Sequence, residues 1–390
     1  MTSHPDRLYY TDAYLRDFSS EVLRVDGTRV TLAATAFYPT SGGQPFDTGT
    51  LNGMRVVDVI DEDDHIIHVL DRAPSLAVGD TVKGVIDWPR RWDHMQQHTG
   101  QHLLSAVFAD LFGHQTLSVH FGDESATLDL DTDMLSADAA RRAERHANEI
   151  VFEGRLVSVS FEDARSAVGL RKPSDRDGEL RVVGIEGVDR SACGGTHVRS
   201  TAEIGPITLR RIEKTKKAVR VEFRCGWRAL DRARADFVVL QEMAAQLTAG
   251  IDELPSLVTM RIESERSADA ERRKLAEQLA VFQVRELRTA TAPSADGVVR
   301  IVETATTMDA LRLRAQAAAL ESHTLYFGSA GAPPAVVFAA SEDSGVNAGA
   351  VLKAALTAAG GRGGGSPRVA QGTVADSAAL EAVRRDVIGG

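Results

Sequence analysis

Two pairs of candidate metal ligands, far apart in the sequence, constrain the fold of this chain more than any other feature. His98 and His102 are four residues apart in a segment that reads as a helix, and Cys193 and His197 are four residues apart beside two glycines. Residues four apart on a helix share one face, so both imidazoles can reach one ion. Three imidazoles and a thiolate suit zinc. We therefore expect the fold to bring the two pairs together around one Zn2+ per chain.

The histidine pair is predicted to lie in a helix that begins at Asp93. Asp93 can act as the N-cap residue, and Gln96 can complete a capping box. Apolar residues then recur at steps of three and four from Leu103 to Leu111, so one face points into a core. Gly113 is expected to end the helix.

Each pair alone is weak evidence for a metal site. An isolated His-x-x-x-His is more often structural, and an isolated cysteine among glycines is usually a small buried residue. Zinc fingers carry their cysteines as Cys-x-x-Cys, which this chain lacks. The His-Glu-x-x-His proteases place a glutamate base where Thr99 stands here. Only the combination of the two pairs favours zinc.

The same residues carry a family resemblance. Residues 98–104, His-Thr-Gly-Gln-His-Leu-Leu, together with residues 192–198, Ala-Cys-Gly-Gly-Thr-His-Val, resemble the editing domain of alanyl-tRNA synthetases. Free-standing relatives of that domain are the alanyl-tRNA editing proteins, or AlaX proteins, and the length here is similar to their long form. The resemblance extends to the glycine-rich residues 37–49 and to residues 203–207. Residues 360–372 resemble the C-terminal domain of the synthetase.

The resemblance implies a hydrolase that acts in trans, without ATP, on mischarged alanine tRNA. Ser-tRNA(Ala) is the expected substrate and Gly-tRNA(Ala) a second one. It also implies that residues 41–44 close over the site, with Gln44 offering its amide to the substrate, whereas the bare sequence allows a plain hairpin turn. We count further candidates for the catalytic site from the cysteine turn and from residues 116–121: Gly194, Thr196, Thr116, Ser118 and His120.

Alternation predicts that Thr116, Ser118 and His120 share one face of a strand. Thr116 or Ser118 could hydrogen-bond the serine hydroxyl, and a role as ordinary strand residues is the alternative. The zinc could polarise the ester carbonyl, hold the amine or lower the pKa of a bound water. Four protein ligands would close its coordination, so either His197 binds loosely or the metal mainly positions the substrate. No carboxylate base is evident in either motif.

A formal charge of −10 argues against a generally basic nucleic-acid binder, so tRNA contacts must come from local patches. The best patch follows the cysteine turn, and a solvated surface strand is the alternative reading. Its candidate tRNA contacts are Arg210, Arg211, Lys214, Lys216, Lys217 and Arg220, with Arg224 beside them.

The expected fold is α+β in four parts. Residues 1–90 alternate as short strands and predict a small β-barrel, and residues 91–227 predict an α+β editing domain with the zinc site. Residues 228–292 show a coiled-coil seam, read as a helical hairpin within one chain or as the seam of a homodimer. Residues 293–390 predict an α/β tRNA-binding domain that could also dimerise. Its glycine tract 360–365 is either a flexible loop or, beside Arg362 and Arg368, a phosphate site.

The remaining features are typical of a cytoplasmic protein. No apolar run is long enough to cross a bilayer, and the first residues lack the apolar stretch of a signal peptide. Two cysteines cannot form a disulfide framework. Two other functions share part of this pattern. One is a zinc-stabilised tRNA-binding module without catalysis. The other is a metallohydrolase for small molecules, for which the helical arm of residues 228–292 and the last domain would be superfluous.

Overall fold

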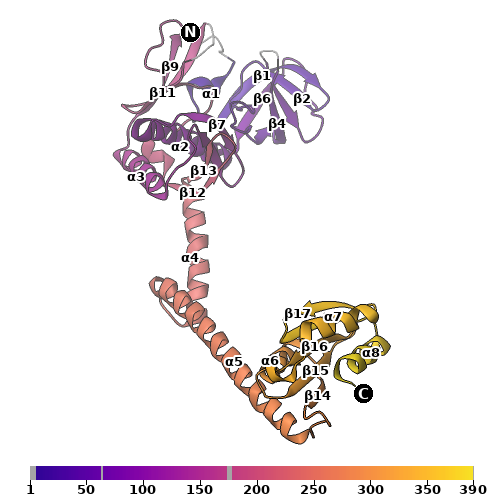
Figure 1. The fold of residues 1–390 in the computed structure, drawn as a ribbon. Helices are drawn as coiled ribbons and strands as arrows, with labels where there is room; N and C mark the ends of the chain where they lie inside the picture. Colours follow the sequence, from indigo (N-terminus) through magenta and orange to yellow (C-terminus); the bar gives the residue numbers. More distant parts are fainter. Residues whose placement is uncertain (1–5, 63–64, 174–177, 390) are drawn as a thin grey trace. The chain divides into compact units, whose positions relative to one another are not determined.

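The computed structural model describes residues 6–62, 65–173 and 178–389. These residues form two compact units, Met1–Met243 and Ala244–Gly390. The first holds both candidate ligand pairs, and the ribbon is drawn in Figure 1. In the described residues, no helix is both long and apolar enough to cross a membrane.

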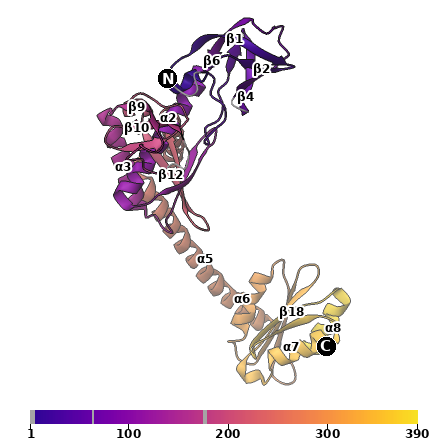
Figure 2. The same ribbon diagram turned by 90° about the horizontal axis from the view of Figure 1, so that it is seen from above.

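The first unit begins with a closed six-stranded barrel, which confirms the predicted small β-barrel. The chain enters it through the short helix α1 (Leu8–Thr11), and the strands pair in the order β1-β2-β5-β4-β3-β6. Strict alternation of buried and exposed residues in β6 shows why the sequence folds this way, because only one side of each strand faces the core. The barrel strands group together in Figure 2. They are β1 (Asp17–Asp26), β2 (Arg29–Leu32), β3 (Gly49–Leu51), β4 (Met54–Glu62), β5 (His65–Leu70) and β6 (Thr81–Ile86).

The histidine helix α2 (Trp88–Phe112) begins earlier than predicted. Asp87 precedes it and Pro89 occupies its first turn, a position that needs no backbone N–H. The predicted N-cap at Asp93 is therefore wrong: Asp93 lies inside the helix and forms an ion pair with Arg228. Gln96 donates to the Glu203 carbonyl instead of closing a capping box. The helix ends, as expected, at Gly113, which has a left-handed φ of 72°.

Two sheets and a second helix pack around α2 in the first unit. One sheet has the order β12-β13-β8-β7 and the other β11-β10-β9. Buried residues of α2, including Leu103, Leu104 and Phe108, share a core with Phe223 of the larger sheet. The elements are β7 (Thr116–Phe121), β8 (Ala126–Leu130), α3 (Ala137–Glu153), β9 (Val157–Asp163), β10 (Glu179–Ile185), β11 (Asp189–Ala192), η1 (Thr201–Ile204), β12 (Ile207–Lys214) and β13 (Val219–Cys225).

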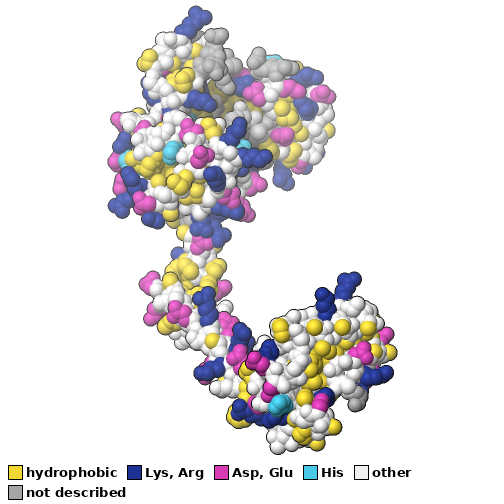
Figure 3. Space-filling view, viewed as in Figure 1, with side chains coloured by type: hydrophobic (Ala, Val, Ile, Leu, Met, Phe, Trp, Pro, Cys, Tyr) yellow, Lys and Arg dark blue, Asp and Glu magenta, His cyan; other side chains and the backbone are white. Residues whose placement is uncertain are grey.

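Two long helices follow, α4 (Trp227–Leu247) and, after η2 (Ile251–Glu253), α5 (Leu254–Ala290). Several residues of the predicted seam on α4 are solvent-exposed, among them Leu230, Phe237 and Leu240. Hydrophobic side chains are visible along α4 in Figure 3. The hairpin and the dimer seam both stay predictions. Near its end α5 buries Val284 in the core of the C-terminal domain.

The C-terminal domain is α/β, as predicted. Its sheet has the order β14-β15-β16-β18-β17, with β14 and β15 parallel. Phe327 packs with α7 and α8 on one face, whereas Tyr326 packs with α6 and α5 on the other. Both faces are covered, which explains the continuous apolar runs. The elements are β14 (Val299–Thr304), α6 (Met308–Ala318), β15 (Thr324–Ala330), β16 (Ala335–Ala340), η3 (Glu342–Ser344), α7 (Ala348–Ala358), β17 (Arg362–Gly365), β18 (Val369–Thr373) and α8 (Ser377–Ile388).

Most of the glycine tract of this domain is not a flexible loop. Residues Arg362–Gly365 form strand β17, which pairs with β18 along its length, and phosphate binding beside Arg362 and Arg368 stays a prediction. A Cβ at Gly363 would lie 2.4 Å from the Gln371 carbonyl oxygen and 2.5 Å from Leu356, and one at Gly365 would lie 2.4 Å from Ala370. Gly363 and Gly365 are needed because the neighbouring chain leaves no room for side chains there.

Candidate metal centre

The four predicted ligands converge. The candidate donor atoms of His98, His102, Cys193 and His197 all lie within 4.8 Å of one another. The Cys193 Sγ atom is 3.4 Å from His98 Nε2 and 3.3 Å from His197 Nε2. All three imidazoles are buried, and α2 supplies two of them while the turn after β11 supplies the rest. The two sequence pairs therefore form one buried group.

Thr99 fixes the tautomer of His197. The Thr99 hydroxyl donates its proton to the Met95 carbonyl at 2.8 Å, so it can only accept from His197 Nδ1 at 3.1 Å. It also accepts from the Val198 N–H at 3.2 Å. His197 therefore carries its proton on Nδ1 and presents the Nε2 lone pair to the thiol. Thr99 occupies the position of a protease glutamate, yet it serves to orient a ligand.

Gln44 fixes His98 by the same kind of reasoning. The Thr196 N–H points at Gln44 Oε1 at 3.1 Å, so that atom must be the amide oxygen. The same oxygen lies 2.8 Å from His98 Nδ1, which must then be the donor. The amide nitrogen of Gln44 donates to the Thr196 hydroxyl at 2.8 Å. Gln44 is buried, and its amide is engaged with the protein rather than held open.

Asp189 completes the set on His102. His102 Nδ1 lies 2.9 Å from Asp189 Oδ2, and Arg171 holds the other carboxylate oxygen at 2.7 Å. The Ser191 hydroxyl contacts the same carboxylate. All three histidines thus have Nδ1 bound to an outer partner and Nε2 directed at the thiol. Histidines that bind metals are oriented in this way by outer hydrogen bonds.

The electrostatics favour an ionised thiol. Burial opposes ionisation of Cys193, but His98 and His197 outweigh it and bring the pKa of the thiol well below its usual value. Burial also lowers the pKa of His197, to about 3, so its imidazole is neutral. At His102 burial is outweighed by the hydrogen bond to Asp189, which raises the pKa to about 9. The centre pairs a thiolate with an imidazole that can be a cation.

These donors fit zinc. A thiolate with imidazole lone pairs is a ligand set that structural and catalytic zinc sites use, and the outer carboxylate and amide match what such ligands require. The Cys193 thiolate and the neutral His197 are already the deprotonated forms that a metal needs, whereas His102 would release a proton when a metal binds. The turn also depends on glycine, because a Cβ at Gly195 would lie 2.2 Å from His98 Cε1. At Gly194 a Cβ would lie 3.3 Å from the Tyr10 hydroxyl.

Strand β7 does not place its three candidates on one face. A bulge between Thr116 and Ser118 shifts the register, so the expected alternation fails there. Thr116 donates to Ser105 of α2 at 2.7 Å, whereas Ser118 donates to Asp129 across the sheet. His120 is exposed and follows Ser118 on that other face. Phe121, with its ring centroid 5.2 Å from that of His98, is the β7 residue that borders the metal centre.

The predicted tRNA contacts differ in whether their side chains form ion pairs with carboxylates of the protein. Arg210, Arg211 and Arg220 form ion pairs with Asp236, Glu213 and Asp129. Lys214, Lys216 and Lys217 are exposed around the β12–β13 connection and form no ion pair among the described residues. In the C-terminal domain Arg368 is paired with Glu342, and Arg362 is exposed on β17. The lysines are the strongest of these candidates.

Sequence reasoning missed Asp189, Thr99 and Arg181. Asp189, Ser191 and Cys193 alternate, which is the signal that a carboxylate shares a side of the strand with the cysteine. Arg181 is buried and donates to the Cys193 carbonyl at 2.6 Å and to the Tyr10 carbonyl at 3.0 Å. No local pattern indicates Arg181, because its partners are distant in the sequence.

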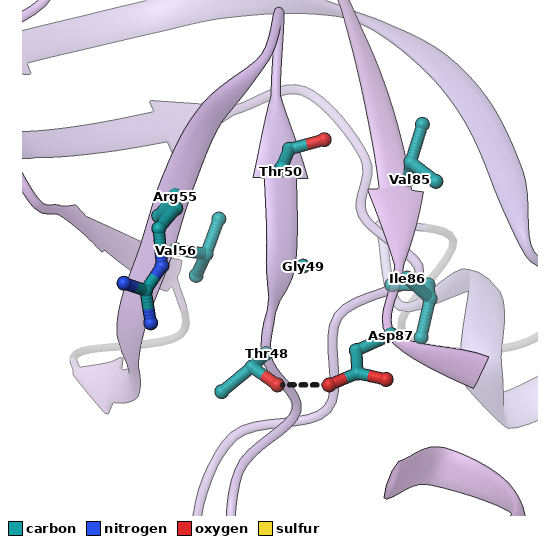
Figure 4. A pocket seen from close by; sticks show the side chains of 8 residues that line it. All are labelled: Thr48, Gly49, Thr50, Arg55, Val56, Val85, Ile86 and Asp87. Carbon is teal, nitrogen blue, oxygen red and sulfur yellow. Dashed lines mark hydrogen bonds between the residues drawn. The ribbon is translucent and has the colours of Figure 1, made fainter. Parts of the chain in front are cut away.

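A cavity of about 360 Å³ lies elsewhere, on the barrel (Figure 4). Thr48, Asp87 and Arg55 are among the residues that line it, and the Thr48 hydroxyl donates to Asp87. None of the candidate ligands lines it. The metal centre is therefore the better candidate for chemistry.

Comparison with known proteins places the chain among tRNA-related families. A model described as tRNA synthetases class II (A) matches residues 11–90. A model described as threonyl and alanyl tRNA synthetase second additional domain matches residues 180–222, which include Cys193 and His197. A crystal structure of the C-Ala domain from Aquifex aeolicus alanyl-tRNA synthetase matches 23% of this chain and 89% of that one, at 22% identity and a TM-score of 0.20.

Similarity to individual proteins over longer stretches of the chain identifies the family. Alanine–tRNA ligase of Pyrococcus abyssi is 33% identical over 96% of this chain and 43% of the ligase. Alanyl-tRNA editing protein AlaX-L of Pyrococcus horikoshii is 36% identical over 58% of this chain and 59% of that protein. The chain thus spans less than two thirds of either archaeal relative. It covers 70% of alanyl-tRNA editing protein Aarsd1 of Bos taurus, at 31% identity. Because it covers more than two thirds of this relative at more than 30% identity, and carries the ligand group described above, the chain belongs to the AlaX-type alanyl-tRNA editing proteins.

Proposed function

We propose that the protein is a zinc-dependent aminoacyl-tRNA deacylase that removes serine from mischarged alanine tRNA, with Gly-tRNA(Ala) as a second substrate. The observation that carries the proposal is the buried group of three oriented imidazoles and one thiol in a chain of this family. Bound zinc would polarise the ester carbonyl, hold the amine or activate water. The chain's own residues act by orienting the ligands, excluding water and holding the substrate beside them.

The outer partners define what the protein contributes to this chemistry. Gln44, Thr99 and Asp189 each hold one histidine in the tautomer that leaves Nε2 free. We infer that Gln44 acts through His98, since its amide is already engaged. Thr116 lies on the α2 side of β7, so it is the better of the two strand candidates for contact with the serine hydroxyl. Gly194 and Thr196 shape the turn that carries the ligands.

The decisive experiment measures release of serine from Ser-tRNA(Ala), beside Gly- and Ala-tRNA(Ala), for wild type and His102→Ala. We expect the variant to lose most of its activity. His120→Ala is a matched control, because this histidine is exposed on the other face of β7. A wild-type protein that binds tRNA without releasing serine would leave the alternative, a zinc-stabilised tRNA-binding module.

We further propose that residues 293–390 serve tRNA capture. The metal centre contacts little more than the acceptor end, so a second linked contact raises affinity through effective concentration, by about 10² in favourable geometry. Truncation after Thr291 should raise KM for tRNA more than it lowers kcat, and should not alter the preference for serine over alanine. Equal KM values would assign the domain to oligomerisation or to another partner.

A further inference from the structure

His94 is a buried histidine that no part of the metal centre uses. It lies on α2 one turn before His98, and its side chain is almost fully buried. Neither of its ring nitrogens hydrogen-bonds to any residue that the structure describes, and Nδ1 is completely enclosed. An unpaired buried polar atom costs free energy, on the order of 1–3 kcal/mol. A leucine at this position would avoid that cost, so packing alone does not explain the histidine.

The surroundings of His94 keep its imidazole neutral. Burial lowers its pKa to about 3, with smaller contributions from Arg90, Arg228 and Arg91. A neutral imidazole offers one donor and one acceptor, which suits the hydroxyls and base edges of a nucleoside. Arg228 and Arg91 are ion-paired with Asp93 and Asp47, so Arg90 is the cation near His94 that no carboxylate among the described residues neutralises.

Arg90 extends the same row by one more turn. Arg90, His94 and His98 are spaced four residues apart, so their side chains follow one another on one helix face at intervals of about 6 Å. The Arg90 Nε atom donates to the Phe46 carbonyl at 3.0 Å, and its guanidinium lies over the Phe46 ring. In the described part of the chain it forms no ion pair with a carboxylate. The row thus runs from a cation, through a neutral hydrogen-bonding group, to a metal ligand.

We propose that Arg90 and His94 bind the terminal nucleotide of tRNA, with the phosphate at Arg90, the nucleoside at His94 and the ester at the metal centre. Phosphate, ribose and acyl ester follow in this order in an aminoacylated nucleotide, as the three side chains do on α2. The inference rests on the proposed deacylase function. It assigns substrate binding to two residues outside the metal centre and outside the basic β12–β13 strands.

His94→Leu tests the assignment. We expect kcat/KM for Ser-tRNA(Ala) to fall on the order of tenfold, the effect of one lost hydrogen bond. Affinity for uncharged tRNA(Ala) should fall by a similar factor, because the contact needs no amino acid. Zinc content should be unchanged, and the free energy of unfolding in urea should be unchanged or higher. Because Nδ1 is enclosed, Nε2 is the nitrogen that a nucleoside can reach. Gln, which places its amide near Nε2, should therefore restore binding, whereas Asn, which places its amide near Nδ1, should not.

Arg90→Gln provides an independent measurement. It should weaken binding of uncharged tRNA(Ala) and lower the slope of log K against log salt by roughly one. Arg24→Gln, at an exposed barrel position, is the matched control.

Several results would overturn the proposal. One is unchanged activity and binding in His94→Leu. Another is a loss of activity accompanied by a loss of zinc or of stability, which would make His94 structural. A loss of catalysis with unchanged binding of uncharged tRNA would place His94 at the ester rather than at the nucleotide. A wild-type protein inactive on Ser-tRNA(Ala) would instead refute the proposed function, and binding of uncharged tRNA by the variants would still decide this assignment.

Discussion

Replacing Arg91 by methionine should strongly destabilise the first unit. Arg91 and Asp47 form an ion pair in which both side chains are completely buried. Arg91 also donates to the Ala13 carbonyl at 2.8 Å and to the Ala36 carbonyl at 2.5 Å. Removing the guanidinium leaves a buried carboxylate and two carbonyls without their donor. Breaking one partner of such a pair costs about 3–5 kcal/mol of unfolding free energy.

Urea unfolding followed by tryptophan fluorescence measures this loss. All three tryptophans, Trp88, Trp92 and Trp227, belong to the first unit, so the signal reports that unit alone. Arg24→Met is the control, because Arg24 and its partner Asp26 are largely exposed and such pairs contribute little.

A double variant separates the charge from the packing. Asp47 also accepts from the Tyr38 N–H at 2.6 Å, which an asparagine oxygen can still do. Arg91→Met with Asp47→Asn should therefore recover part of the loss, since no buried charge is left unpaired. A loss below about 1 kcal/mol in Arg91→Met, or no recovery in the double variant, would refute the reasoning.

Three further predictions follow from the same contacts. Asp189→Asn should weaken zinc binding about 10- to 100-fold in a chelator competition, whereas Asp129→Asn should leave it unchanged, because Asp129 is in another sheet and pairs with Arg220. Replacing the lysines of the β12–β13 connection by alanine should weaken tRNA binding and reduce its salt dependence by roughly one unit of slope per lost phosphate contact; an unchanged slope would leave them a solvated face. The lysines are Lys214, Lys216 and Lys217. Burial lowers the pKa of His68 to about 4, so below pH 6.5 the unfolded chain binds a proton at this histidine that the folded chain does not bind. The free energy of unfolding is therefore unaffected by His68 above pH 6.5 and falls by about 3 kcal/mol between pH 6.5 and pH 4. The variant His68→Leu should flatten this part of the stability profile.

The sequence was informative wherever one element carries its own periodicity. Alternation predicted the barrel, buried apolar runs predicted the last sheet, and the spacing of His98, His102, Cys193 and His197 predicted a common site. These signals are local, or they repeat a chemical type at a fixed interval. The position of the metal group could be predicted because ligand chemistry leaves few partners for each donor.

The errors arose where one residue changed the geometry or where tertiary contacts decided the outcome. Pro89 in the first turn allowed α2 to begin at Trp88, before Asp93, which the sequence pattern had favoured as the N-cap residue. One bulge moved Thr116 away from Ser118, and a bulge leaves no clear mark in composition. Residues 362–365 of the glycine tract form a strand that pairs with β18, and α7 and β18 leave no room for a side chain at Gly363. Asp189 and Gln44 are recognisable as partners of histidines only once the chain has folded.

The outer hydrogen bond of His98 makes the barrel and the metal group interdependent. The amide oxygen that turns His98 belongs to Gln44, in the segment that connects two barrel strands, while every candidate ligand lies after residue 90. A fragment starting at residue 91 would keep all four ligands and lose the acceptor that directs one of them. By thermodynamic linkage, a metal ion bound by His98 would also stabilise the packing of the barrel segment that carries Gln44, and removal of that ion would weaken this packing.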